Sequence, residues 1–323
     1  MNRQRLDFLD IAKGITVLWV VWMHMEMPMH IWACFQMPLF FFLSGTLYRQ
    51  PQIENTKAWF KKKSKSLLIP ALTFFCISLI IILLKQGGKV SGSNLFWKIH
   101  TVGSASIIWF LEAMFLYLCF HYTVTRWLKW KYWGITISLL IYPLGYYLYA
   151  KKMGNIIPCL YLDNILVFWF YFELGCLRGS SYNWVIGYDK GVVKKRFRWL
   201  IATIAYVFIV CTPYLNEFFL RRIIGGNYLY PIYIIPFNLG MIYLVVLFSH
   251  YFEKFQISKI WKFYGINSLV VYLAHWPIYM FLVTPWITAG MDKYCAFIIV
   301  ILMVTACIYF FNSYCPFLIG KNK

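Results

Sequence analysis

Long apolar stretches alternate with short polar connections along the whole chain. They lie at 11–29, 31–48, 67–84, 105–125, 132–150, 163–178, 199–216, 230–252, 263–283 and 294–313. A helix needs about 20 apolar residues to cross a hydrocarbon core of about 30 Å. We therefore predict an all-α integral membrane protein, a polytopic helical bundle of about ten transmembrane helices.

The composition supports this prediction. The 323 residues are 61% hydrophobic and only 13% charged, whereas a soluble domain is about 45–50% apolar and about 25% charged. The nine cysteines are scattered and contain no C-x-x-C pair, so no disulfide framework is predicted. The first apolar stretch lacks a small-residue cleavage site and is expected to stay in the protein as a span. With no repeat and no long polar segment, residues 1–323 are expected to form a single membrane domain.

The distribution of charge predicts the orientation of the chain. There are 31 basic and 11 acidic residues, a net charge of +20, which in a soluble protein would suggest nucleic acid. Here 23 of the 31 basic residues fall in the termini and in alternate connections, as the positive-inside rule requires. We therefore expect both termini on the cytoplasmic side of the cell membrane and no nucleic acid partner. The same excess of positive charge suits anionic lipids or a polyanionic substrate.

Ionisable residues inside apolar stretches are costly and are usually functional, so they are the first candidates for a site. Lys13 and His24 are 11 residues apart, which at about 100° per residue places them on one helix face with a rise of about 16 Å. Asp10 lies one turn before Lys13 on nearly the same face. If Lys13 sits at the inner interface, His24 lies near the middle of the membrane. A functional role for His24 is therefore favoured over a structural one, while Asp10 and Lys13 also fit a simple interfacial ion pair.

Three carboxylates form a second group of candidates. Glu112 lies a few residues inside the stretch at 105–125, and Asp163 and Glu173 lie in the stretch at 163–178. Each is expected to face the protein interior. Their roles stay open between a proton relay, a base partner for His24 and an acceptor for sugar hydroxyls.

The remaining candidates have equally strong structural explanations. His275 lies deep in the stretch at 263–283, and Ser44 follows a run of phenylalanines in the second stretch. Helix packing explains Ser44-Gly45, and Asn267-Ser268 suit a helix start. Arg221 and Arg222 either bind an anionic acceptor or solvate an outer connection. The basic run before the third stretch either binds anionic lipids or holds the phosphates of a cytoplasmic donor; it comprises Lys57, Lys61, Lys62, Lys63 and Lys65, with Arg49 upstream.

Several fragments resemble, in order, the membrane acyltransferase-3 family. The first is L-D-F-L-D-I-A-K-G-I-T-V-L-W-V-V-W-M-H at 6–24, in which a basic residue, ten further residues and a histidine correspond to Lys13 and His24; many members have Arg at the first position. The fragments P-L-F-F-F-L-S-G at 38–45, L-L-I-P at 67–70, I-W-F-L at 108–111 and Y-L-A-H at 272–275 are also similar. Y-L-D-N at 161–164 with F-E-L-G at 172–175 resembles the fucose 4-O-acetylase-like branch.

The resemblance implies O-acyl transfer, usually of acetyl, from cytoplasmic acetyl-CoA or another acyl-CoA to a hydroxyl of a cell-surface glycan or its lipid-linked precursor. It implies that His24 is the catalytic residue, and we expect Glu112 or Asp163 to orient His24 or the sugar. Donor binding is expected from Asp10, Lys13, Arg49, Lys61, Lys63 and Lys65, and acceptor binding from Ser44, Glu173, Arg221, Arg222 and His275. No metal motif is present in the sequence, so no metal is expected. An oligomer is compatible with this sequence.

Two other functions remain open. An exporter or flippase of a glycan precursor would use the same buried His, Glu and Asp residues as a proton relay. A membrane scaffold for glycan synthesis would not need a histidine on one face with Lys13 and Asp10. Binding of coenzyme A separates the acyltransferase from both.

Overall fold

The computed structural model describes residues 6–27, 35–85, 108–128, 130, 132–150, 161–179, 199–207, 209–210 and 230–321. All regular secondary structure in these ranges is helical, as predicted. The elements with defined ends are α1 (Asp7–His24), α2 (Gln36–Thr46), η2 (Ile53–Asn55), α3 (Thr56–Lys85), α5 (Trp109–Trp127), α6 (Trp133–Ala150), α7 (Leu162–Arg178), α10 (Tyr230–Phe252), α11 (Ser258–Ile266), α12 (Ser268–Pro277), the π-helix η6 (Ile278–Val283), α13 (Thr284–Thr288), α14 (Lys293–Ser313) and η7 (Pro316–Ile319). A further helical segment covers 199–207 and 209–210.

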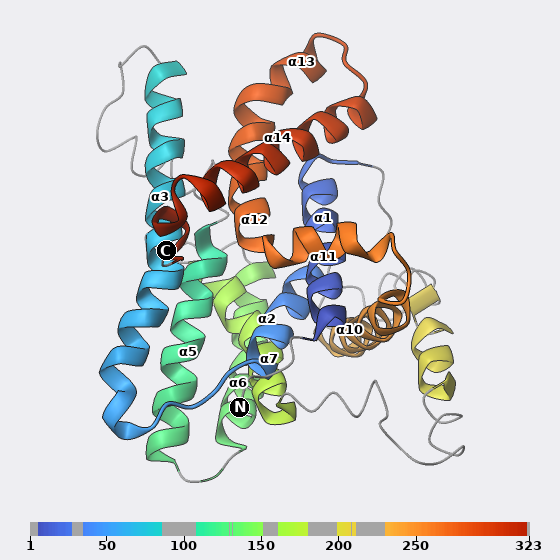
Figure 1. The fold of residues 1–323 in the computed structure, drawn as a ribbon. Helices are drawn as coiled ribbons and strands as arrows, with labels where there is room; N and C mark the ends of the chain where they lie inside the picture. The colour runs from blue at the N-terminus through green and yellow to red at the C-terminus, as the bar shows by residue number, and fades with distance from the viewer. Residues whose placement is uncertain are drawn as a thin grey trace.

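Four helical stretches in the described ranges are long and apolar enough to cross a membrane. They are Thr56–Ile81 in α3, Ile234–Phe252 in α10, Ser268–Thr288 from α12 to α13, and Lys293–Ser313 in α14. The helices do not run parallel: Figure 1 shows α10 nearly along its axis while α3 runs within the plane of the view. The chain is thus an all-helical membrane protein, and the number of ten spans and the cytoplasmic termini remain predictions.

Two helices differ from their predicted bounds in ways that matter for the site. Helix α1 ends at His24 rather than near residue 29, because Glu26 adopts a left-handed backbone conformation with φ of 51°. Helix α3 begins at Thr56, so the lysine run lies on its first turns rather than before it. His24 is therefore at the end of its helix, and the lysines are displayed on a helical surface.

The predicted stretch at 263–283 covers the end of α11, α12 and η6, and α11 and α12 meet at Asn267. Asn267 occupies the N-cap position of α12 but makes no side-chain cap. Its Nδ2 donates to the carbonyl of Phe263 at 3.0 Å, and its Oδ1 accepts from Asn312 Nδ2 at 2.9 Å. The side chain thus connects α11 to α14 at the bend.

Helices α1 and α11 touch backbone to backbone where they cross (Figure 1). A Cβ on Gly14 would overlap the carbonyl oxygen of Trp261, and one on Gly265 would overlap that of Asp10. An ion pair between Lys262 Nζ and Asp7 Oδ2 at 2.6 Å joins the same two helices. This crossing sets the position of α1 relative to α11 and the following α12.

Buried apolar side chains form two clusters. One gathers around α2, α5, α7 and α10, and the other around α1, α12 and α14. Helices α2 and α7 approach closely within the first, since a Cβ on Gly45 or Gly175 would overlap the backbone of the facing helix. A cavity lies between the two clusters, with walls from both.

Candidate active site

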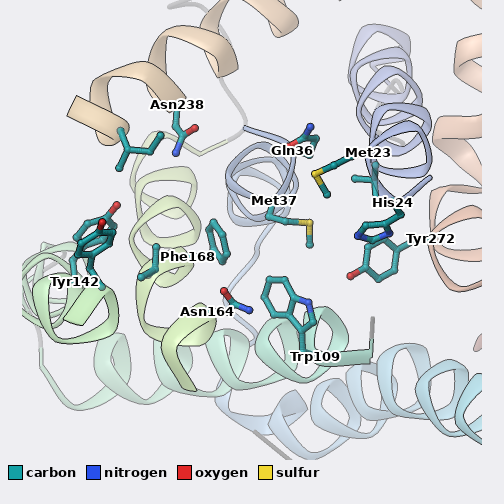
Figure 2. Close-up of a pocket in the computed structure, with 14 residues that line it drawn as sticks. Met23, His24, Gln36, Met37, Trp109, Tyr142, Asn164, Phe168, Asn238 and Tyr272 are labelled. Atoms are coloured by element: carbon teal, nitrogen blue, oxygen red, sulfur yellow. The ribbon is translucent and has the colours of Figure 1, made fainter. Parts of the chain in front are cut away.

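The cavity has a volume of about 290 Å³ and is lined by α1, α2, α5, α6, α7, α10 and α12. Most of its wall is aromatic or aliphatic, with polar side chains at His24, Gln36, Asn164 and Asn238. Figure 2 shows His24 beside Met23 and Tyr272 on one side of the cavity and Asn238 on the other. The wall therefore combines an imidazole with several amides.

His24 is hydrogen-bonded to a second histidine. Its Nδ1 lies 2.8 Å from Nε2 of His275, which comes from α12 and is fully buried. The two rings are nearly parallel, with an angle of 14° between them, and Trp276 packs against His24 in a T-shaped contact. His24 is thus held on two sides while it faces the cavity.

The hydrogen bonds assign the protons of this pair. His275 Nδ1 lies 3.0 Å from the carbonyl oxygen of Val271, which only accepts, so His275 Nδ1 carries a proton and donates it. In a neutral His275 the Nε2 is then an acceptor, and His24 Nδ1 must be the donor. The second nitrogen of a neutral His24, Nε2, is therefore left with its lone pair.

The three candidate carboxylates are not bonded to His24 among the described residues. Glu112 Oε2 is buried and has no hydrogen-bond partner there. Asp163 accepts from the backbone N–H of Asn164 at 2.8 Å, and it is Asn164 that lines the cavity. Catalytic roles for Glu112 and Asp163 stay predictions, and the partner of His24 is His275.

Glu173 lies in a separate buried cluster. Its Oε2 is 2.7 Å from His121 Nδ1, and its Oε1 accepts from Trp169 Nε1 at 2.8 Å. Cys176 is also nearby, and the three ligand atoms of His121, Glu173 and Cys176 lie within 4.8 Å of one another. The hydrogen bond between His121 and Glu173 holds these two side chains together.

The candidate donor residues lie elsewhere on the protein. Lys13 Nζ is 3.6 Å from the largely buried Asp10, while Lys61 and Lys65 are exposed and Lys63 is half-buried on α3. Arg49 is exposed beside an open cavity of about 420 Å³ lined by Gln50, Pro51, Gln52, Glu54 and Arg126.

Of the candidate acceptor residues in the described ranges, only His275 forms a hydrogen bond with the His24 side chain. Ser44 is half-buried on α2. Arg221 and Arg222 lie outside the described residues. The predicted roles of Ser44, Arg221 and Arg222 in acceptor binding stay predictions.

One family model accounts for almost the whole chain. The model for the acyltransferase domain matches residues 6–315. The chain belongs to the acyltransferase-3 family. No curated protein and no solved structure matches this acyltransferase.

In this acyltransferase the sequence alone missed most of the cavity wall. Trp109, Asn164 and Asn238 lie in apolar stretches, and Gln36 lies in the stretch at 31–48. Asn238 had a usable signal, because an amide within the stretch at 230–252 is a polar group in a predicted span. The His121–Glu173 pair was missed because its members are 52 residues apart.

The buried pair leads to a prediction on stability. Replacing Glu173 by leucine removes the acceptor of both His121 and Trp169, and breaking a buried pair in this way costs roughly 3–5 kcal/mol. We expect a clearly lower midpoint of unfolding in detergent. The matched control is Glu253→Leu, because Glu253 forms a pair with His250 at 3.2 Å that is much more exposed, and such pairs contribute about 0–1 kcal/mol. Equal midpoints for the two variants would contradict the structural role of Glu173.

Proposed function

We propose that this protein is a membrane-bound O-acyltransferase of the cytoplasmic membrane. It moves an acyl group, acetyl in the first instance, from cytoplasmic acyl-CoA to a hydroxyl of a cell-surface glycan or its lipid-linked precursor. The observation that carries the proposal is the His24–His275 pair in the wall of a cavity lined by aromatic and amide side chains.

The chemistry follows from the protons assigned to the pair. His24 Nε2 accepts the proton of the acceptor hydroxyl while its oxygen attacks the thioester carbonyl. The carbon–sulfur bond breaks, and the departing coenzyme A thiolate takes the proton from His24. His275 Nε2 accepts the hydrogen bond from His24 Nδ1. This bond holds the His24 ring and stabilises the positive charge that develops on His24. A two-step route in which His24 Nε2 carries the acyl group uses the same atom.

The cavity wall supports a sugar as the acceptor. Trp109, Phe168 and Tyr142 offer flat aromatic faces, and Gln36 and Asn164 offer amides. Small-molecule sites usually have such apolar walls with a few placed polar groups, and volumes of about 300–1,000 Å³. At about 290 Å³ the cavity is at the lower end of that range, which favours one ring-sized group.

The basic face near the start of α3 supports a phosphate-bearing donor. Lys61 and Lys65 are exposed on its first turns. Arg126 adds a cation to the open cavity beside Arg49, and cations bind phosphates through charge-assisted hydrogen bonds. The same face suits anionic lipids, so donor binding has to be measured.

The test uses the purified protein in nanodiscs with radiolabelled acetyl-CoA. We expect saturable donor binding, thiol release and transfer of label to a glycan acceptor. If the folded protein has no affinity for acetyl-CoA or a related acyl-CoA, the assignment of the donor is wrong, and the export of a glycan precursor becomes the favoured function. The export alternative would use His24 and the carboxylates as a proton relay. Within the described ranges, no hydrogen bond links His24 to Glu112, Asp163 or Glu173.

The pairing of the two histidines gives a further prediction. His275→Leu removes the acceptor for His24 Nδ1, so the ring loses its tautomer and orientation, and we expect kcat to fall roughly 10²-fold with the KM for acyl-CoA unchanged. His275→Gln keeps an oxygen acceptor and is expected to retain more activity. Steady-state thiol release measures both variants. Equal losses in the two, or an effect on KM alone, would contradict the positioning role.

A further inference from the structure

Asn238 stands apart from the other polar residues of the cavity wall. It lies on α10, is only 3% exposed and lines the cavity. Figure 2 shows it on the opposite side of the cavity from His24. A ligand that fills the cavity therefore meets His24 at one side and Asn238 at the other.

The amide of Asn238 is held in place from behind. Its Nδ2 donates to the hydroxyl of Tyr171 at 2.9 Å, and Tyr171 on α7 is fully buried. This bond ties α10 to α7 across 67 residues of sequence. The orientation of the amide is thus set before any ligand binds.

The other atom of the amide has no such partner. Asn238 Oδ1 is buried and accepts no hydrogen bond from any residue that the structure describes. A buried acceptor without a donor loses its interaction with water and gains nothing in return. An acceptor in the wall of a ligand cavity is satisfied when the ligand brings a donor.

We propose that Asn238 Oδ1 accepts a hydrogen bond from a second hydroxyl of the acyl acceptor, other than the hydroxyl that loses its proton to His24. This inference rests on the proposed function and sharpens it. The acceptor is a rigid ring with at least two hydroxyls, one at His24 Nε2 and one at Asn238 Oδ1. A ligand lacking the second hydroxyl leaves the buried oxygen unpaired, and sites of this kind discriminate strongly against it.

The experiment is a double-mutant cycle between the protein and the acceptor. The probes are p-nitrophenyl glycosides of glucose, galactose, fucose, rhamnose and N-acetylglucosamine, followed by every monodeoxy form of the best acceptor, with labelled acetyl-CoA as donor. For the wild type we expect one monodeoxy form, besides the one lacking the acylated hydroxyl, to lose about 10-fold or more in kcat/KM. Asn238→Leu, which has a similar shape but no acceptor, is expected to use the parent glycoside and that monodeoxy form equally.

Two further variants complete the design. Tyr171→Phe keeps Oδ1 but frees the amide, so the discrimination should shrink without vanishing. Ser249→Ala on the same helix removes a hydroxyl whose one hydrogen bond within the described ranges goes to the carbonyl of Val245, and it should behave as the wild type. All variants are compared by size-exclusion profile and midpoint of unfolding.

The outcomes separate the inference from the proposed function. If Asn238→Leu discriminates among the monodeoxy glycosides as the wild type does, the inference is wrong and the acyltransferase stands. If no monodeoxy form except the one lacking the acylated hydroxyl is disfavoured, a water molecule suffices for Asn238 and the inference is also wrong. If the wild type releases thiol from acetyl-CoA but neither binds nor acylates any glycoside, both the inference and the sugar acceptor fail. Without donor turnover, the proposed function itself fails.

Discussion

Replacing His24 by alanine is expected to lower acyl transfer by about 10²- to 10⁴-fold, the range that a general base contributes. The loss should appear in kcat, because His24 Nε2 acts on the proton that moves as the acceptor oxygen attacks. The folded protein should still insert into the membrane, since His24 is the last residue of α1 and supports no later turn of it. Label transfer from acetyl-CoA, compared at equal amounts of folded protein, measures the effect.

The matched control for His24 is its neighbour. Met25 is almost fully buried but is not part of the cavity wall, and exchange of Met for Leu usually costs less than about 1.5 kcal/mol. Met25→Leu should therefore retain activity. Transfer by His24→Ala at the level of Met25→Leu would refute the assignment of the base.

Replacing Gly265 by alanine is expected to disturb both the packing of the helices and the activity. The new Cβ would overlap the carbonyl oxygen of Asp10, which is backbone and has no other rotamer to adopt. Overpacking typically costs about 1–3 kcal/mol, and here α1 and α11 must separate. Because α11 leads directly into α12, the separation also disturbs His24 relative to His275, and a displacement of about 1 Å at a reacting group can cost about 10²-fold in rate.

A glycine with free space supplies the comparison. The Cβ of an alanine at Gly240 would lie 3.4 Å from the nearest atom, a methyl of Ala205, and an alanine in a helix interior is favoured over glycine by about 1 kcal/mol. Thermal unfolding in detergent should therefore show a lower midpoint for Gly265→Ala and an unchanged or higher one for Gly240→Ala. A normal midpoint and normal activity for Gly265→Ala would mean that the two helices do not cross in contact.

The sequence was most informative where a pattern is local. The apolar stretches predicted α10 and α14 almost to the residue, because hydropathy and helical hydrogen bonding are both satisfied within one segment. The ends were less predictable where a single residue decided them. Glu26 ended α1 early through its backbone conformation, and Asn267 divided one expected helix into two.

The candidate site was predicted only in part for the same reason. His24 could be singled out because a histidine in an apolar helix is costly and because a family pattern includes it. Its partner could not be predicted, since the sequence offered the carboxylates for that role and placed His275 among the acceptor-binding residues. His24 and His275 are 251 residues apart, and no local rule places α12 rather than α5 or α7 against the end of α1.

By itself, the sequence determined that this protein is helical, that it belongs in a membrane and that His24 is the residue to test first. These properties depend on composition and on spacings within one helix. Only the tertiary structure decided that His275 holds His24, that Glu173 belongs to a separate pair with His121, and that Asn238 faces the cavity with an unpaired oxygen. Each of these depends on how distant helices pack, and packing is set by the fit of many side chains at once rather than by any single segment.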